Sequence, residues 1–294
     1  MVRIMKNDVF NFSRFSRYMA TDIRNAISNF GISLLVIATL GLSIDIFKGL
    51  MSMTISDGWK GLGDDSRFVL FCFAFFIAFV SSPSKIYGFF TDKKDGSAFL
   101  TLPVSTLEKT LSMVIISCIL VPAVFLAVYL SIDQLVCLVD STCGNPLVIK
   151  LADLKVNILD TAKIGIAPAA AFIQNPEALF SVWLYIDDLI QIPLCFLLGA
   201  LYFNKSKVAK TFGTLLLLGM LFSLITTSIV GLGIKDQMEQ LISTGELSVQ
   251  NFGDYFPGLK WVVNHAVLVD TVNDTLINIL LFFLVWLRIR KTNH

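Results

Sequence analysis

Two sets of carboxylates are the residues best suited to chemistry in this sequence. The string GLGD at 61–64 ends in Asp64, and the string YIDD at 185–188 ends in Asp187 and Asp188. Two facing aspartates can share a proton and activate a water molecule for hydrolysis. An aspartyl hydrolase is therefore one function that these residues could support.

The expected surroundings of these carboxylates argue against a hydrolase. GLGD matches the GxGD string of intramembrane aspartyl proteases, but Asp64 shares a polar outer segment with Asp65 and Arg67. Asp187 and Asp188 fall near the outer end of an apolar segment. Solvated carboxylates keep their ordinary acidity. An intramembrane aspartyl protease is therefore a remote alternative, and we expect no catalytic residue in this chain.

Metal and nucleotide chemistry lack their usual residues as well. The two histidines are His265 and His294, and no HExxH motif is present. There is also no GxxxxGK[ST] loop, so the chain cannot hydrolyse ATP by itself. We expect no metal-binding residue, no cofactor-binding residue and no cofactor.

The five cysteines fall into two groups. Cys72, Cys118 and Cys195 lie within apolar segments as ordinary packing residues, whereas Cys137 and Cys143 share one polar connection. The second pair can form a disulfide in an oxidising compartment. Two free thiols are equally compatible with the sequence.

Composition places the chain in a membrane. Hydrophobic residues make up 55% of its 294 residues, 25 residues are Phe, and the mean hydropathy is +0.75. One soluble core cannot enclose that much apolar surface, so the lipid bilayer is an expected partner. The net charge of +1 gives no attraction to nucleic acid.

Six segments are long and apolar enough to cross a bilayer, which takes roughly 20 residues per helix. The segments lie at about 29–47, 68–87, 110–132, 180–203, 211–233 and 270–288. They lack the period-two alternation of membrane strands. We expect an all-α integral membrane protein, with an N-terminal segment 1–28 and a six-helix transmembrane domain 29–291.

The distribution of positive charge predicts the orientation. With the N-terminus in the cytoplasm, 15 of the 23 Lys and Arg residues fall on the cytoplasmic side and 8 on the other. Cytoplasmic connections carry the excess of positive charge in membrane proteins. We expect both termini and the connection 83–109 in the cytoplasm, with the connections 133–179 and 234–269 outside.

The N-terminal segment has the pattern of an amphipathic helix lying in the membrane interface. Its expected apolar face holds Phe12, Phe15, Met19, Ile23 and Ile27, and its polar face holds Arg14, Arg17, Thr21 and Arg24. Arg side chains on such a helix reach lipid phosphates. An amphipathic extension without a fixed role is the open alternative.

The connection 83–109 combines a helix start with a chain break. Ser105 and Glu108 have the spacing of a capping box at the start of the third apolar segment. Pro103 prevents a preceding helix from continuing through this point. The chain is therefore expected to turn before residue 105.

A short helix is expected before that break, from Asp95 to Leu102. It would present Phe99, Leu100 and Leu102 as a small apolar face on the cytoplasmic side. An exposed apolar face of this kind is typical of a docking surface for a partner protein. A loop folded back onto the membrane surface is the alternative that periodicity leaves open.

Two stretches resemble a known transporter family. The run GSAFLTLPVSTLEKTLS at 96–112 resembles the region between the second and third spans of type-2 ATP-binding-cassette export permeases. The run LLGALYFNK at 197–205 is similar to the end of the fourth span in bacterial members. The resemblance implies a permease subunit in a bacterial cytoplasmic (inner) membrane.

The same resemblance implies partners and contact residues. A separate ATP-binding-cassette ATPase subunit would drive the permease, which would pair with a second copy of itself or with a related permease. Residues 92–109 would then couple the two subunits, through Asp95, Phe99, Leu100, Leu102, Pro103, Ser105 and Glu108.

Two other membrane functions remain as alternatives. An ion-coupled secondary carrier usually places charged residues within its spans, whereas Asp187, Asp188 and Asp274 lie toward the outer ends of theirs. A non-transporting scaffold or immunity protein needs no such residues. We expect an ATPase-driven exporter, and the sequence does not indicate its cargo.

Overall fold

The described part of the chain is helical. The computed structural model describes residues 10–55, 58–91, 96, 102–140, 142–151, 176–244 and 266–292. In the last two ranges the side chains are described only for residues 186–225, 268 and 271–292. The main elements are α1 (Phe12–Ala38), α2 (Leu40–Ile55), α3 (Asp64–Tyr87), the 3₁₀ turn η1 (Gly88–Thr91), α5 (Thr106–Ile115), the π-helical turn η2 (Ile116–Leu120), α6 (Val121–Val139), α9 (Pro176–Tyr202), α10 (Lys207–Thr244) and α13 (Ala266–Thr292).

Five helical stretches among these residues are long and apolar enough to cross a membrane. They are Phe12–Ile55, Asp64–Thr91, Thr106–Val139, Lys207–Ile225 and Thr271–Thr292. The chain is therefore a helical, multi-pass membrane protein. The fourth expected segment, 180–203, falls on α9, whose side chains are described only from Ile186 onward.

The expected boundary at residue 28 is not a break in the structure. Helix α1 runs from Phe12 to Ala38, and only the turn at Thr39 separates it from α2. Asn11 caps the start of α1 by accepting hydrogen bonds from the backbone N–H groups of Ser13 and Arg14. The amphipathic segment and the first apolar segment thus form one nearly continuous rod.

The buried face of α1 differs from the apolar face expected from the sequence. Phe12 and Ile27 were expected on that face, but they are 74% and 65% exposed. The buried residues recur at helical spacing and are Phe15, Tyr18, Asp22, Ala26, Phe30, Leu34 and Ala38. An apolar face that meets lipid would be exposed in the protein alone, so the interfacial helix stays a prediction. The buried row, which includes the charged residue Asp22, packs on the other helices.

Aromatic side chains fill the space between α3 and α6. The ring centroids of Phe71 and Tyr129 lie 5.2 Å apart in an edge-on arrangement, and those of Phe75 and Phe125 lie 5.8 Å apart. Such tilted and edge-on pairs suit the charge distribution of aromatic rings. This cluster fixes α3 against α6 near the middle of both helices.

The third apolar segment is a composite helix. The capping box is confirmed, because Ser105 accepts from the Glu108 backbone N–H while the Glu108 side chain accepts from the Ser105 N–H. Helix α5 then passes through the π-helical turn η2 into α6. A π turn carries one extra residue and changes the phase of the faces on either side of it.

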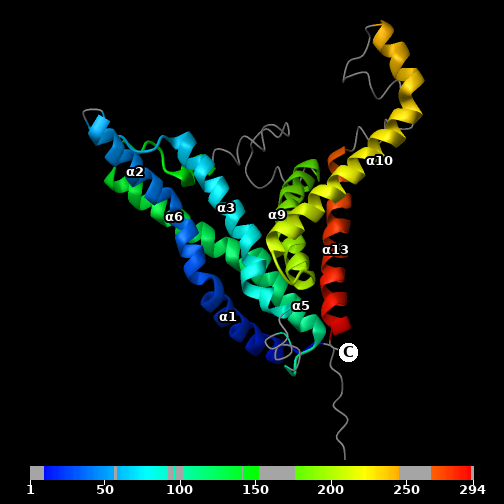
Figure 1. Cartoon of the computed structure of the whole chain (residues 1–294), viewed down its shortest axis with the longest axis horizontal. Coiled ribbons are helices and arrows are strands. Elements are labelled where there is room, and N and C mark those ends of the chain that lie inside the picture. The colour runs from blue at the N-terminus through cyan, green and yellow to red at the C-terminus, as the bar shows by residue number, and fades with distance from the viewer. Residues whose placement is uncertain are drawn as a thin grey trace, which may run out of the picture.

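Figure 1 shows the helices alternating in direction along the chain. The start of α1, the start of α5 and the end of α13 lie together at the lower end of the view, whereas the end of α2, the start of α3 and the end of α6 lie at the upper left. Helix α9 packs most extensively on α13 and next on α3, and α10 has fewer contacts with either α9 or α3. Helix α10 therefore packs on α9 less extensively than α13 and α3 do.

Candidate functional site

Glu108 fastens the segment before α5 to the start of α1. Its carboxylate accepts two hydrogen bonds from the Arg14 guanidinium, both of 2.8 Å, and one of 2.7 Å from the Asn11 backbone N–H. The capping contact with Ser105 is a fourth hydrogen bond. Glu108 is fully buried, and a charge in that position needs such a complete set of donors.

The expected coupling residues therefore divide into two kinds. Ser105 and Glu108 hold the chain in place, whereas Leu102 is 42% exposed and Pro103 is also exposed. The structure thus leaves an apolar edge beside a fixed point. Asp95, Phe99 and Leu100 lie outside the described residues.

Two further contacts hold the start of the same connection. Lys207, at the start of α10, donates to the Gly88 carbonyl oxygen and to Thr91 Oγ1 at 2.8 Å. Gly96 lies directly on η1, since a Cβ at this position would lie 2.4 Å from the Phe90 carbonyl oxygen. The connection is therefore attached to α10 at one end and to α1 at the other.

A buried polar cluster lies close to this region. The Asp22 carboxylate accepts a hydrogen bond of 3.0 Å from the Tyr87 hydroxyl and one of 2.6 Å from Ser112 Oγ. These three residues come from α1, α3 and α5, and each is buried. Sequence reasoning missed this cluster, although Asp22 stands four residues from Tyr18 and from Ala26, both in the buried row.

A second buried cluster lies at the opposite end of the molecule. Arg67 Nη1 donates to Asp133 at 2.7 Å, and Arg67 Nη2 donates to Asp64 at 3.1 Å and to the carbonyl oxygens of Cys143 and Asn145 at 2.7 Å each. Arg67 was expected in a polar outer segment. It is only 5% exposed, because it begins α3 underneath the connection that follows α6.

That connection contains a disulfide. Cys137 and Cys143 are joined with their Cα atoms 5.1 Å apart. Cys137 belongs to the end of α6, and Cys143 lies in the following turn. The bond holds the carbonyl oxygen of Cys143 over Arg67. Of the connections expected on the outside, 133–179 and 234–269, residues 141, 152–175 and 245–265 lie outside the described part.

The carboxylates considered for hydrolysis have separate partners. Asp64 contacts Arg67. The Asp187 carboxylate accepts hydrogen bonds from Thr275 Oγ1 and from the Asn278 amide on α13, and the same amide donates to the Asp187 carbonyl oxygen. Each group is thus engaged by its own surroundings. Among the residues described, no group of three His, Cys, Asp or Glu side chains is placed to hold a metal ion.

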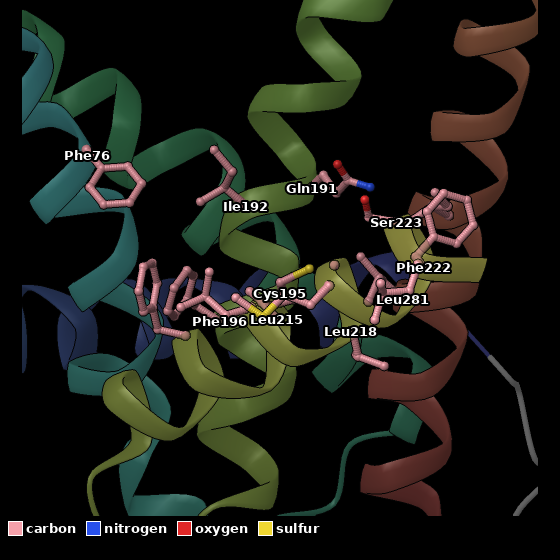
Figure 2. Close-up of a pocket in the computed structure, with 16 residues that line it drawn as sticks. Phe76, Gln191, Ile192, Cys195, Phe196, Leu215, Leu218, Phe222, Ser223 and Leu281 are labelled. Atoms are coloured by element: carbon pink, nitrogen blue, oxygen red, sulfur yellow. The ribbon is translucent and has the colours of Figure 1, made fainter. Parts of the chain in front are cut away.

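A large apolar cavity of about 1130 Å³ lies between α9, α10 and α13 and reaches α3 at Phe76. Figure 2 shows its side chains, among them Phe196 and Leu215 at one part and Leu281 at another. Gln191 and Ser223 also line it, and their polar ends lie next to each other in this view. None of the described residues that line the cavity is charged.

Comparisons with protein-family models, with curated proteins and with solved structures found no match.

Proposed function

We propose that this chain is the membrane-spanning permease subunit of an ATP-binding-cassette transporter, acting as an exporter in a bacterial cytoplasmic membrane. A separate ATPase subunit supplies the energy, and the permease pairs with a second copy or with a related permease. The observation that carries the proposal is the attachment of the connection 88–109 to α1 through Glu108 and to α10 through Lys207.

This attachment allows a movement of a bound partner to be transmitted to the membrane helices. A loop held only by its own ends would bend when a partner pressed on it. Here a displacement of Leu102 acts on a fixed chain, because four hydrogen bonds hold Glu108 six residues later. The displacement therefore reaches α5 and α1 together. A scaffold without a moving partner does not require such a linkage.

The arrangement of helix ends supports the proposed orientation. The start of α1, the connection before α5 and the end of α13 lie at one end of the molecule (Figure 1), which agrees with both termini on one side. The excess of Lys and Arg on this side supports a cytoplasmic location for this end. The test is an introduced cysteine at Ser97, expected to resist impermeant thiol reagents in intact cells. Its labelling there would reverse the orientation.

The decisive experiment replaces the apolar edge by charge. In Phe99→Asp/Leu102→Asp, unpaired carboxylates would enter the partner contact, and we expect loss of the co-purified ATPase and of its stimulated ATP hydrolysis. The control is Val148→Asp/Ile149→Asp, since these residues are 43% and 47% exposed, similar to Leu102, and lie far along the chain from this edge.

The remaining outcomes separate the other functions. A scaffold or immunity protein would retain no ATPase in either form, and an ion-coupled carrier would transport without one. A loop that only rests on the membrane surface would leave the ATPase bound to both variants. An ATPase that stays bound to the Phe99/Leu102 variant with unchanged turnover would refute the coupling role.

A further inference from the structure

The apolar cavity between α9, α10 and α13 contains two polar groups that the described protein leaves unbonded. Neither the Gln191 amide nor the Ser223 hydroxyl makes a hydrogen bond with another residue in the part of the chain that the structure describes. Both belong to helices of the membrane region, and both line the cavity. Among the described lining residues, the other side chains that can take part in hydrogen bonding are the weakly polar Cys195 and Met220.

Unbonded polar groups at this depth are costly. Within a bilayer no bulk water is present to satisfy an amide or a hydroxyl, and lipid chains offer neither donors nor acceptors. Filling the cavity with hydrocarbon alone would leave this cost in place. An occupant that carries its own hydrogen-bonding group would remove it. The two side chains thus favour an amphiphile over plain lipid chains.

The rest of the cavity defines the remainder of that occupant. The other lining residues are apolar or aromatic, with Phe76, Phe196, Phe212 and Phe222 among them. A volume of about 1130 Å³ lies slightly above the range of about 300–1,000 Å³ that is usual for one bound small molecule. The described lining residues offer no charged side chain to pair with an ionic head group, which favours a neutral one.

We infer that this cavity binds one neutral amphiphile, whose uncharged hydroxyl or amide head group lies between Gln191 and Ser223 and whose hydrocarbon chain lies against the aromatic side chains. Gln191 both donates and accepts, and so does Ser223, so the pair satisfies a hydroxyl in either role. The inference goes beyond the proposed transport function, because it assigns a ligand class that holds whether or not an ATPase is bound.

The test uses the full chain in nanodiscs of phosphatidylcholine with three photoreactive probes of equal chain length. The probes are a monoacylglycerol, a fatty acid ionised at the assay pH, and an alkane without a head group. We expect the monoacylglycerol to label peptides of α9 and α10 about tenfold more than the alkane does, which is the effect of satisfying one otherwise unbonded group. The ionised fatty acid should label least.

Two residues of α10 with equal exposure provide a matched pair of variants. Leu218 and Leu217 are both 62% exposed, but only Leu218 lines the cavity. Leu218→Trp should fill the space and reduce monoacylglycerol labelling about tenfold, whereas Leu217→Trp should leave it unchanged. Gln191→Leu/Ser223→Ala should bring monoacylglycerol labelling down to the level of the alkane. Membrane expression and thermal unfolding confirm that each variant is folded.

Several results would overturn the inference. Equal labelling of the two tryptophan variants would mean that only surrounding lipid is detected. A preference for the ionised fatty acid would refute the neutral class, and unchanged labelling of Gln191→Leu/Ser223→Ala would refute the polar recognition. If labelling is absent and a cysteine at Leu218 instead cross-links two chains, a second copy covers the cavity.

Discussion

The guanidinium of Arg67 lies 2.7 Å from the carboxylate of Asp133, and both side chains are only 6% exposed. The pair joins the start of α3 to α6 across 66 positions of sequence. A buried charge that loses its partner is strongly destabilising, because its desolvation is then uncompensated. The second carboxylate at Arg67 belongs to Asp64, which is 35% exposed.

We predict that Asp133→Asn lowers the free energy of unfolding by about 3 kcal/mol, whereas Asp64→Asn lowers it by at most about 1 kcal/mol. The measurement is unfolding by heat and by denaturant in the same detergent. Each substitution neutralises one carboxylate that contacts the Arg67 guanidinium. The two carboxylates differ chiefly in burial, so the comparison isolates the effect of burial. Equal losses would show that burial of the Arg67–Asp133 pair adds nothing.

The disulfide gives a second prediction. Mass spectrometry under non-reducing conditions should find Cys137 linked to Cys143. For a bridge with a sequence separation of 6, the loop-entropy relation gives a loss of about 2 kcal/mol in Cys137→Ser/Cys143→Ser. Membrane insertion should persist, because Arg67 still binds the carbonyl oxygen of Cys143. Free thiols in protein from an oxidising compartment would contradict the assignment.

The Glu108 contacts separate into a cap and an ion pair. Glu108→Gln keeps an acceptor for the Ser105 N–H, since Gln also completes a capping box, but it loses the charge opposite Arg14. We expect a loss of about 1 kcal/mol for Glu108→Gln and about 3 kcal/mol for Glu108→Ala, which leaves buried donors unbonded. Arg24→Gln, at an exposed position on the same helix, serves as the control. Similar values for both Glu108 variants would rule out a role for the cap.

The hydrogen bonds of the Asp140 carboxylate predict that the free energy of unfolding depends on pH. Burial by itself raises the pKa of this carboxyl group, but hydrogen bonds from Thr142 and Trp59 outweigh burial and hold the pKa below its ordinary value. The resulting stabilisation is present above the unfolded pKa of about 3.9 and is lost as the pH falls through the lower, folded value. Asp140→Asn should therefore be less stable than the native chain at pH 7.

The stability difference between Asp140→Asn and the native chain should shrink as the pH falls below about 4. Unfolding measured at several pH values between 7 and 3 provides the check. A difference that stays constant across this range would mean that the Asp140 carboxylate contributes no pH-dependent stability.

Local sequence signals predicted the features that depend on local chemistry. The capping box at Ser105 and Glu108 needs only residues three positions apart, and the apolar segments need only their length and hydropathy. Both were recognisable without the fold. The second role of Glu108 was not, because Asn11 and Arg14 lie 97 and 94 positions away.

Charged residues were the main source of error. Arg67 was expected in a polar outer segment, since an isolated charge avoids burial, and Asp22 was assigned to neither face of the N-terminal helix. In the structure each is buried because partners on other helices satisfy it, such as Tyr87 for Asp22 and Asp133 for Arg67. Such pairings are tertiary and leave no periodic signal.

The cavity was hidden from sequence reasoning for a different reason. Gln191 and Ser223 are 32 positions apart on separate helices, and each alone is an ordinary polar residue within an apolar run. Their meeting depends on the loose packing of α10 against α9. The sequence pattern of a single helix does not show how far that helix lies from its neighbours.

The contact between Arg14 and Glu108 also sets an order of events during biosynthesis. Its two residues are 94 positions apart, so at a synthesis rate of about 5–20 residues per second the contact cannot form until roughly 5 to 20 s after Arg14 has been made. During that interval the chain from α1 through α3 is made before its anchor at Glu108 exists. The link between the starts of α1 and α5 is thus among the later contacts to form, once the third apolar segment has been synthesised.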